Sequence, residues 1–111
     1  MMKVGIIRCQ QTEDICCGDI DLKAARRGSQ AFKGTGPVEV VGFASCGGCP
    51  GKKASFRAQI MVAQGARVIV FASCIAKGTP NGFPCPFFVK MKKVMTKQLG
   101  SKVKFIDWTH D

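Results

Sequence analysis

Four short segments of the chain are dominated by Val, Ile, Phe and small residues, and each has the pattern of a β-strand. They are residues 3–8 (KVGIIR), 38–45 (VEVVGFAS), 67–73 (RVIVFAS) and 102–108 (KVKFIDW). The first three are nearly continuous apolar runs, which is typical of parallel strands covered on both faces. The pattern therefore predicts a parallel sheet inside the fold.

The clearest helical pattern covers residues 86–99. Apolar residues recur there at helical spacing, at Phe88, Met91, Met95 and Leu99. Gly100 is placed to end the helix, and prolines lie near its start. We expect Met91 and Met95 to belong to the core and not to be metal ligands.

Two further helical patterns are weaker. The pattern of residues 51–64 predicts a helix. Its apolar face would contain Phe56, Ile60 and Ala63, and its polar face would contain Lys53, Arg57 and Gln64. A helix beginning at Asp21 would run through Leu22 and Ala25 to Phe32, although Gly28 interrupts it.

The order of elements is strand, helix, strand, helix, strand, helix, strand. With right-handed crossovers, this order predicts a small α/β fold with an open, parallel, four-stranded sheet and helices on both faces, a three-layer arrangement of the Rossmann-like or flavodoxin-like kind. No linker divides the 111 residues, so we expect a single domain over residues 1–111.

Composition narrows the setting of the protein. No apolar run approaches the ~20 residues that cross a bilayer, and residues 1–9 do not have the pattern of a secretory leader. We therefore expect a cytoplasmic protein that has no membrane partner.

The net charge of the chain is +10. Nucleic-acid binding is one reading of this charge, but Lys90, Lys92, Lys93 and Lys97 fit the polar side of one helix and no stacking platform is evident, so we favour a basic surface.

Seven cysteines provide the candidate chemistry, and their positions follow the predicted strand ends. Cys9, Cys46 and Cys74 each follow a strand, Cys49 comes three residues after Cys46, and Cys85 precedes the last helix. Cys16 and Cys17 lie in the loop after the first strand, and His110 follows the fourth. Because ligands of open parallel sheets bind beyond the carboxyl ends of the strands, we expect one functional cluster at this edge.

Single members of this set also have simpler readings. Cys74 alone could be a small buried residue at a strand end. Cys17 is expected to be a spare, since adjacent side chains seldom bind the same ion. His110 stands next to the last residue of the chain, and both a site role and an exposed end remain open.

The pair in Cys46-Gly-Gly-Cys49 supports two kinds of chemistry. At a helix N-terminus, with Pro50 in the first turn and Lys52, Lys53 and Arg57 nearby, it would have lowered thiol pKa values and suit a dithiol–disulfide couple. Combined with Cys9, Cys74, Cys85 and His110, it would instead bind a metal, either zinc or an iron–sulfur cluster. In a reducing compartment an odd cysteine count favours metal or thiol chemistry over structural disulfides.

Two other chemistries are not favoured. The segment CGGCPGKK lacks the earlier glycine and the Ser or Thr of a phosphate-binding loop. A low-molecular-weight phosphatase loop would place an arginine where Lys52 stands. Acidic residues are few, and Asp107 is the main one near the expected site, so paired carboxylates do not indicate acid–base catalysis.

Long stretches of the chain resemble the CGGC-domain family, named after the motif at 46–49. The resemblance spans nearly the whole chain and is carried by GIIRCQQTED, VGFASCGGCPGKK, FASCIAKG, GFPCPF and IDWTH. It implies zinc binding, with candidate ligands Cys9, Cys16, Cys46, Cys49, Cys74, Cys85 and His110. Members often have histidine after the Pro-Cys-Pro tripeptide where this chain has Phe87. If that histidine is a ligand in those members, the number or geometry of the metals expected here changes.

The sequence therefore leads to one main hypothesis and one alternative. The main hypothesis is a cytoplasmic metal-binding protein, with zinc preferred to an iron–sulfur cluster and with thiolates gathered at one edge of the sheet. The alternative is a thiol–disulfide oxidoreductase that uses Cys46 and Cys49. The pattern identifies neither a small-molecule substrate nor a redox partner, and it leaves open whether the protein is an enzyme.

Overall fold

The computed structural model describes residues 1–78 and 82–111, and at their centre is a parallel sheet. Its four strands lie in the order β2-β1-β3-β4, with β1 at Lys3–Arg8, β2 at Glu39–Ser45, β3 at Val68–Phe71 and β4 at Lys104–Ile106. The two central strands carry the most deeply buried residues, among them Ile6, Ile69 and Phe71. The predicted α/β fold with an open parallel sheet is confirmed.

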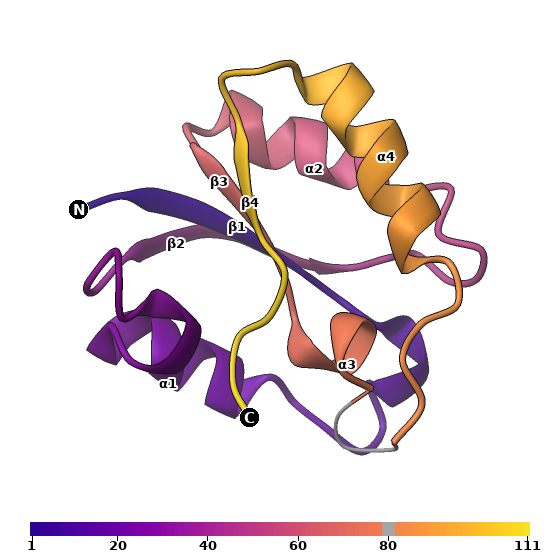
Figure 1. Cartoon of the computed structure of the whole chain (residues 1–111), viewed down its shortest axis with the longest axis horizontal. Coiled ribbons are helices and arrows are strands. Elements are labelled where there is room, and N and C mark those ends of the chain that lie inside the picture. The colour runs from indigo at the N-terminus through magenta and orange to yellow at the C-terminus, as the bar shows by residue number, and fades with distance from the viewer. Residues whose placement is uncertain (79–81) are drawn as a thin grey trace.

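Helices cover the sheet on both sides (Figure 1). On one side lie α2 (Ala54–Ala63) and α4 (Phe88–Leu99), which pack against each other. On the other side lie α1 (Asp19–Arg27) and the one-turn helix α3 (Ser73–Ala76), with the short 3₁₀ turns η1 (Gln10–Thr12) and η2 (Gln30–Phe32). The predicted apolar stripe of α4 is confirmed at Met91 and Met95, which are buried.

The helix α2 approaches the sheet through two glycines. A Cβ atom built on Gly5 of β1 would lie 2.5 Å from Met61 Sδ, and one built on Gly42 of β2 would lie 2.5 Å from Met61 Cγ. The two glycines are paired in the register of these strands. Together they leave the space that the Met61 side chain fills.

The predicted apolar face of the helix at 51–64 is wrong. Phe56 is 68% exposed and Ile60 is 58% exposed, whereas Ala54, Ala58 and Met61 are buried. The close approach of α2 to Gly5 and Gly42 explains this orientation, because small residues fit a narrow interface and large ones do not. The helix also begins at Ala54, so Pro50 is not in its first turn.

Several other predicted boundaries differ from the structure. Asp21 does not cap a helix: α1 begins at Asp19 after Gly18 and ends at Arg27, where Gly28 has φ 65° and is left-handed. Phe32 lies in η2 instead of continuing that helix. The third strand ends at Phe71, and the following residues form α3, so Cys74 lies within a short helix and not directly after a strand.

Within the described residues, no helix is long and apolar enough to cross a bilayer.

The glycine contact predicts a specific defect. Gly5→Ala would push against Met61 and force α2 to shift, lowering the free energy of unfolding by about 1–3 kcal/mol, the usual cost of overpacking. Chemical denaturation would measure this loss. Adding Met61→Ala should recover part of it, because the double variant removes the clash. Simple additivity of the two single variants would contradict this packing.

Candidate functional site: thiols at the carboxyl edge of the sheet

The Cys46–Cys49 loop follows β2 directly and is fixed by backbone contacts. The Cys46 N–H donates to the Arg8 carbonyl at 2.7 Å, which extends the pairing of β1 and β2 by one residue. Gly47 and Gly48 both have positive φ, 82° and 99°, and turn the chain back on itself. As a result, Cys46 is buried and Cys49 is exposed.

Basic side chains lie against this loop. Arg57 Nη1 donates to Ser45 Oγ at 2.9 Å and to the Ser45 carbonyl at 3.1 Å. A Cβ built on Gly47 would come within 2.8 Å of Lys53 Cβ, and Arg57 is its next neighbour. Because α2 begins at Ala54, five residues after Cys49, this positive charge comes from side chains and not from a helix N-terminus at the motif.

Four thiols from three separate segments form a connected set: Cys9, Cys46, Cys49 and Cys85. Burial raises the pKa of the Cys9 thiol, and negative charge on Cys46 and Cys85 raises it further. Burial likewise raises the pKa of Cys85, with added contributions from Cys46 and Cys49. We call these four residues the edge thiols. Burial, with a smaller contribution from the neighbouring thiols, therefore favours the neutral form of both Cys9 and Cys85.

Backbone N–H groups point at two of the sulfurs. The N–H of Phe87 donates to Cys85 Sγ at 3.4 Å, and the N–H of Cys9 donates to Cys74 Sγ at 3.2 Å. Cys85 is itself anchored, because its N–H donates to the Ile75 carbonyl at 2.8 Å. Burial nevertheless raises the pKa of Cys74, because its effect is larger than that of the hydrogen bond from the Cys9 N–H.

The remaining predicted residues form a second group. A cavity of about 240 Å³ is lined by Cys16, Cys17, Asp19, Asp21, Cys74 and His110, together with two isoleucines. His110 is 5% exposed, and its Nε2 lies 3.5 Å from Asp21 Oδ1. His110 is thus not a frayed end. Cys74 joins the two groups, since its thiol lies beside both Cys9 and Asp21.

A buried hydroxyl holds the C-terminal segment in this position. Ser73 Oγ accepts the N–H groups of Thr109 and His110, both at 3.0 Å, and donates to the His110 carbonyl at 2.5 Å. The Thr109 hydroxyl in turn donates to Asp21. Asp21, predicted to be a helix cap, is therefore a buried acceptor that connects α1 to the end of the chain.

One buried cation stands beside these groups. Arg8 is 7% exposed, and its Nη2 donates to the Cys16 carbonyl and, at 3.4 Å, to Thr12 Oγ1. Its Nε has no hydrogen-bond partner, and no carboxylate pairs with the guanidinium within the described part of the chain. A buried guanidinium without a counter-charge favours negative charge nearby.

Comparison with known proteins gives a result that agrees with the motif at residues 46–49. The sequence model of the CGGC domain matches residues 3–110. The chain belongs to the CGGC domain family. An uncharacterized protein of Methanocaldococcus jannaschii, MJ0582, is 38% identical over 79 residues, which cover 66% of this chain and 62% of that protein. The match thus covers less than two thirds of that relative's length. No solved structure matches this chain.

In this CGGC domain, all seven predicted ligand residues lie near the carboxyl edge, but they do not form one cluster. Cys9, Cys46, Cys49 and Cys85 approach one another, whereas Cys16 and His110 line the separate cavity that Cys74 borders. Over residues 1–78 and 82–111, no three Cys, His, Asp or Glu side chains are grouped closely enough to hold a metal ion.

Sequence reasoning missed four polar residues of this CGGC domain. Arg8 reads as the end of a strand, Asp21 as a cap, and Ser73 and Thr109 as ordinary polar residues beside a strand. The one available signal was Arg8, a charged residue inside an apolar strand segment. Nothing in the local pattern indicates that Asp21 and Thr109, 88 residues apart, share a hydrogen bond.

The raised thiol pKa values predict loss of stability in alkali. Below about pH 8.5, the pKa of cysteine in an unfolded chain, thiols are neutral in both states and the effect is absent. As pH rises further, the unfolded chain releases protons more readily than Cys9, Cys74 and Cys85 in the folded protein, so the folded state loses stability. Denaturant midpoints of metal-free protein between neutral and alkaline pH would measure this loss.

Comparing the unmodified chain with the Cys85→Ser variant distinguishes the effect of thiol ionisation on stability from that of lysine titration. That variant should lose less stability over the same pH interval than the unmodified chain. Equal losses would show that the Cys85 thiol does not contribute.

Proposed function

We propose that this protein binds a metal through the edge thiols, zinc in preference to an iron–sulfur cluster, in a reducing compartment such as the cytoplasm. The observation that carries the proposal is that thiols from three segments approach one another at this edge: Cys46 and Cys85 act on Cys9, and Cys46 and Cys49 act on Cys85, where they add to the effect of burial in raising the pKa of Cys9 and Cys85. Neighbouring thiolates repel one another when no cation lies between them, whereas all four thiols can ionise around a bound metal. A closed set of four thiolates is a common zinc site.

The surroundings of the thiols support this assignment. The N–H group of Phe87 is aimed at Cys85 Sγ, an arrangement that stabilises a thiolate bound to a metal. Lys53 and Arg57, which lie beside the loop, would offset part of the net negative charge of a four-thiolate centre. The donor types and the local charge therefore fit the group.

The present spacing of the thiols adds a condition. Since no three candidate ligands among the described residues are grouped tightly enough for an ion, binding requires the loop segments to close around it. Cys49 is exposed and follows Gly47 and Gly48, so it is the thiol with the most freedom to move. In this proposal the four thiols release their protons as the metal binds, and metal affinity falls at low pH.

A bound zinc would hold three loops together at the end of the sheet. Cys9 follows β1, Cys46 and Cys49 follow β2, and Cys85 precedes α4, so the ion would connect elements far apart in sequence. Its contribution would be to stability and to the order of these loops. Cys74 would remain as a fifth thiol next to the centre, anchored by the Cys9 N–H.

Elemental analysis of anaerobically purified protein tests the proposal. We expect about one zinc ion per chain, as in other four-thiolate sites. Cys46→Ser and Cys85→Ser should lose most of the metal. Cys17→Ser is the matched control, because Cys17 is exposed and lies outside the edge thiols. Removing a metal present at 100 times its dissociation constant should lower stability by about 2.7 kcal/mol.

The same preparation distinguishes the two metals. A brown colour with acid-labile sulfide would identify an iron–sulfur cluster in place of zinc. Protein from cells supplied with both metals that contains neither in stoichiometric amount would refute the metal proposal.

Thiol–disulfide exchange is a second candidate, favoured by the contrast between exposed Cys49 and buried Cys46. An exposed thiolate would attack the disulfide of a partner and the buried thiol would resolve the mixed disulfide, so that two electrons and two protons pass to the partner. The absence of a helix N-terminus at the motif weakens this candidate.

Thiol turnover by the metal-free protein tests this second candidate. Turnover should be lost in Cys49→Ser and kept in Cys17→Ser, with a defined two-electron potential for the Cys46–Cys49 pair. Unchanged turnover in Cys49→Ser would exclude it.

A further inference from the structure

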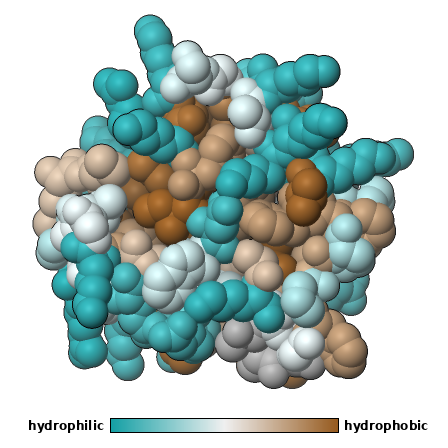
Figure 2. Space-filling model, in the orientation of Figure 1, coloured by the Kyte–Doolittle hydropathy of each residue, from teal (hydrophilic) through white to brown (hydrophobic). Residues whose placement is uncertain are grey.

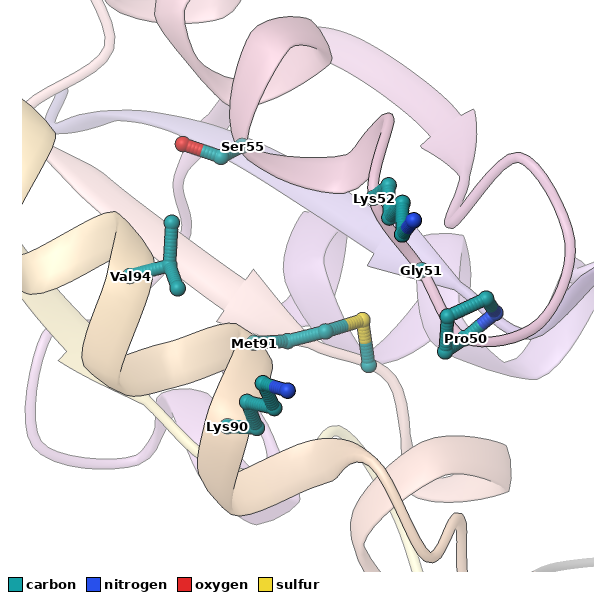
Figure 3. Close-up of a pocket in the computed structure, with 7 residues that line it drawn as sticks. All are labelled: Pro50, Gly51, Lys52, Ser55, Lys90, Met91 and Val94. Carbon is teal, nitrogen blue, oxygen red and sulfur yellow. The ribbon is translucent and has the colours of Figure 1, made fainter.

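A groove of about 190 Å³ lies between α4 and the segment that follows the Cys-Gly-Gly-Cys motif. Its apolar lining comes from Pro50, Gly51, Met91 and Val94, and Lys52 and Lys90 stand on its two sides (Figure 3). The Met91 side chain reaches from α4 toward Gly51, where a Cβ atom would collide with it. Apart from the Ser55 hydroxyl, which is hydrogen-bonded to Gln98, the hollow is therefore apolar inside, and it is cationic at its rim.

The cationic rim continues along α4. Lys90, Lys93 and Lys97 have the i, i+3, i+7 spacing of one helix face, and Val94 lies among them. All three lysines are exposed, and none forms an ion pair with another described residue. Lys92, which lies off this face, is instead paired with Asp107 at 2.7 Å. We call the groove and these lysines the basic groove.

The chain has no negative charge of its own to place there. Residues 40–106 contain eleven Lys and Arg residues and no Asp or Glu. In Figure 2 the side that carries α2 and α4 shows hydrophilic side chains around smaller hydrophobic patches. Such a one-signed field strongly attracts acidic partners and disfavours a second copy of the same chain.

We propose that the basic groove binds an acidic polypeptide segment that inserts an apolar side chain between its carboxylates. The positive charge favours Asp and Glu, and the hollow between α4 and the segment after the motif accepts an apolar side chain that packs against Met91 and Val94, as in other groove-binding peptides. Nucleic acid fits less well, because the lining contains no aromatic ring on which a base could stack. A flat bilayer would not reach apolar atoms that lie inside a hollow.

The position of the basic groove gives this contact a direct relation to the motif. Pro50 lines the groove and directly follows Cys49, whose side chain is exposed. A segment bound in the groove would therefore lie next to this thiol. The inference does not depend on metal binding, since it is based on the shape and charge of the α2–α4 side alone.

A labelled model peptide tests the inference on the full chain. The probe is a fluorescein-labelled helical peptide of glutamates with leucines at i and i+4, and its control has serines in place of the leucines. Fluorescence anisotropy should show binding that weakens with salt, and binding of the serine peptide should be weaker by about tenfold. Amide NMR shifts should change most at Gly51, Lys52, Lys90 and Val94.

Charge-matched variants locate the site. Lys90→Glu/Lys93→Glu should weaken peptide binding by about tenfold or more. Lys23→Glu/Lys33→Glu makes the same change in net charge at exposed positions on the α1 side and should leave affinity within about twofold. Equal losses in the two variants, or no binding of the leucine peptide even at low salt, would overturn the inference.

Val94→Arg separates groove binding from general attraction to polyanions. The side chain of Val94 is 40% exposed, so arginine fits at the surface and fills the hollow while adding positive charge. We expect this variant to lose the peptide. An oligonucleotide of single-stranded DNA or anionic phospholipid vesicles that bind more tightly than the peptide, and keep their affinity for Val94→Arg, would overturn the inference in favour of that ligand.

Discussion

The parallel direction of all four strands determines where chemistry arises in this protein. Each strand of a parallel sheet delivers the residue after its carboxyl end to the same edge, however far apart those residues are in sequence. Here that edge receives Cys9 after β1, Cys46 after β2 and the short helix with Cys74 after β3. Antiparallel strands would have divided the same cysteines between two opposite ends. The direction of the strands thus accounts for the proximity of the thiols without any disulfide or bound ligand.

A second constraint is the separation of charge along the chain. The few carboxylates lie before residue 40 or after residue 106, and Asp21 is buried against Thr109 and His110. In the middle of the chain, which contains the motif, α2 and α4, every charged residue is Lys or Arg. A centre made of thiolates would therefore form in surroundings that already favour negative charge. The same surroundings account for both proposals, one for an ion held by anionic ligands and the other for an acidic partner.

The fold was largely predictable because its signals are local and repeated. Three apolar strand segments, a clear α4 stripe and the alternation of elements together predict an open parallel sheet with helices on both faces. The orientation of α2 was not predictable in this way, since it depends on Gly5, Gly42 and Met61 meeting across three elements. The hydrophobic pattern alone placed Phe56 and Ile60 inside, whereas the narrow helix–sheet contact turned them outward. Placement of the cysteines at one edge followed from the strand ends, but their division into two groups required the path of the loops.

Ser73 gives the C-terminal segment an unexpected influence on the thiols. Its hydroxyl is bound to backbone groups of Thr109 and His110, and the next residue is Cys74, which borders the cavity beneath that segment. Peeling residues 109–111 away from the domain would break these hydrogen bonds and uncover the Cys74 sulfur in the same event. The rate at which Cys74 is alkylated would consequently report how often the end of the chain detaches.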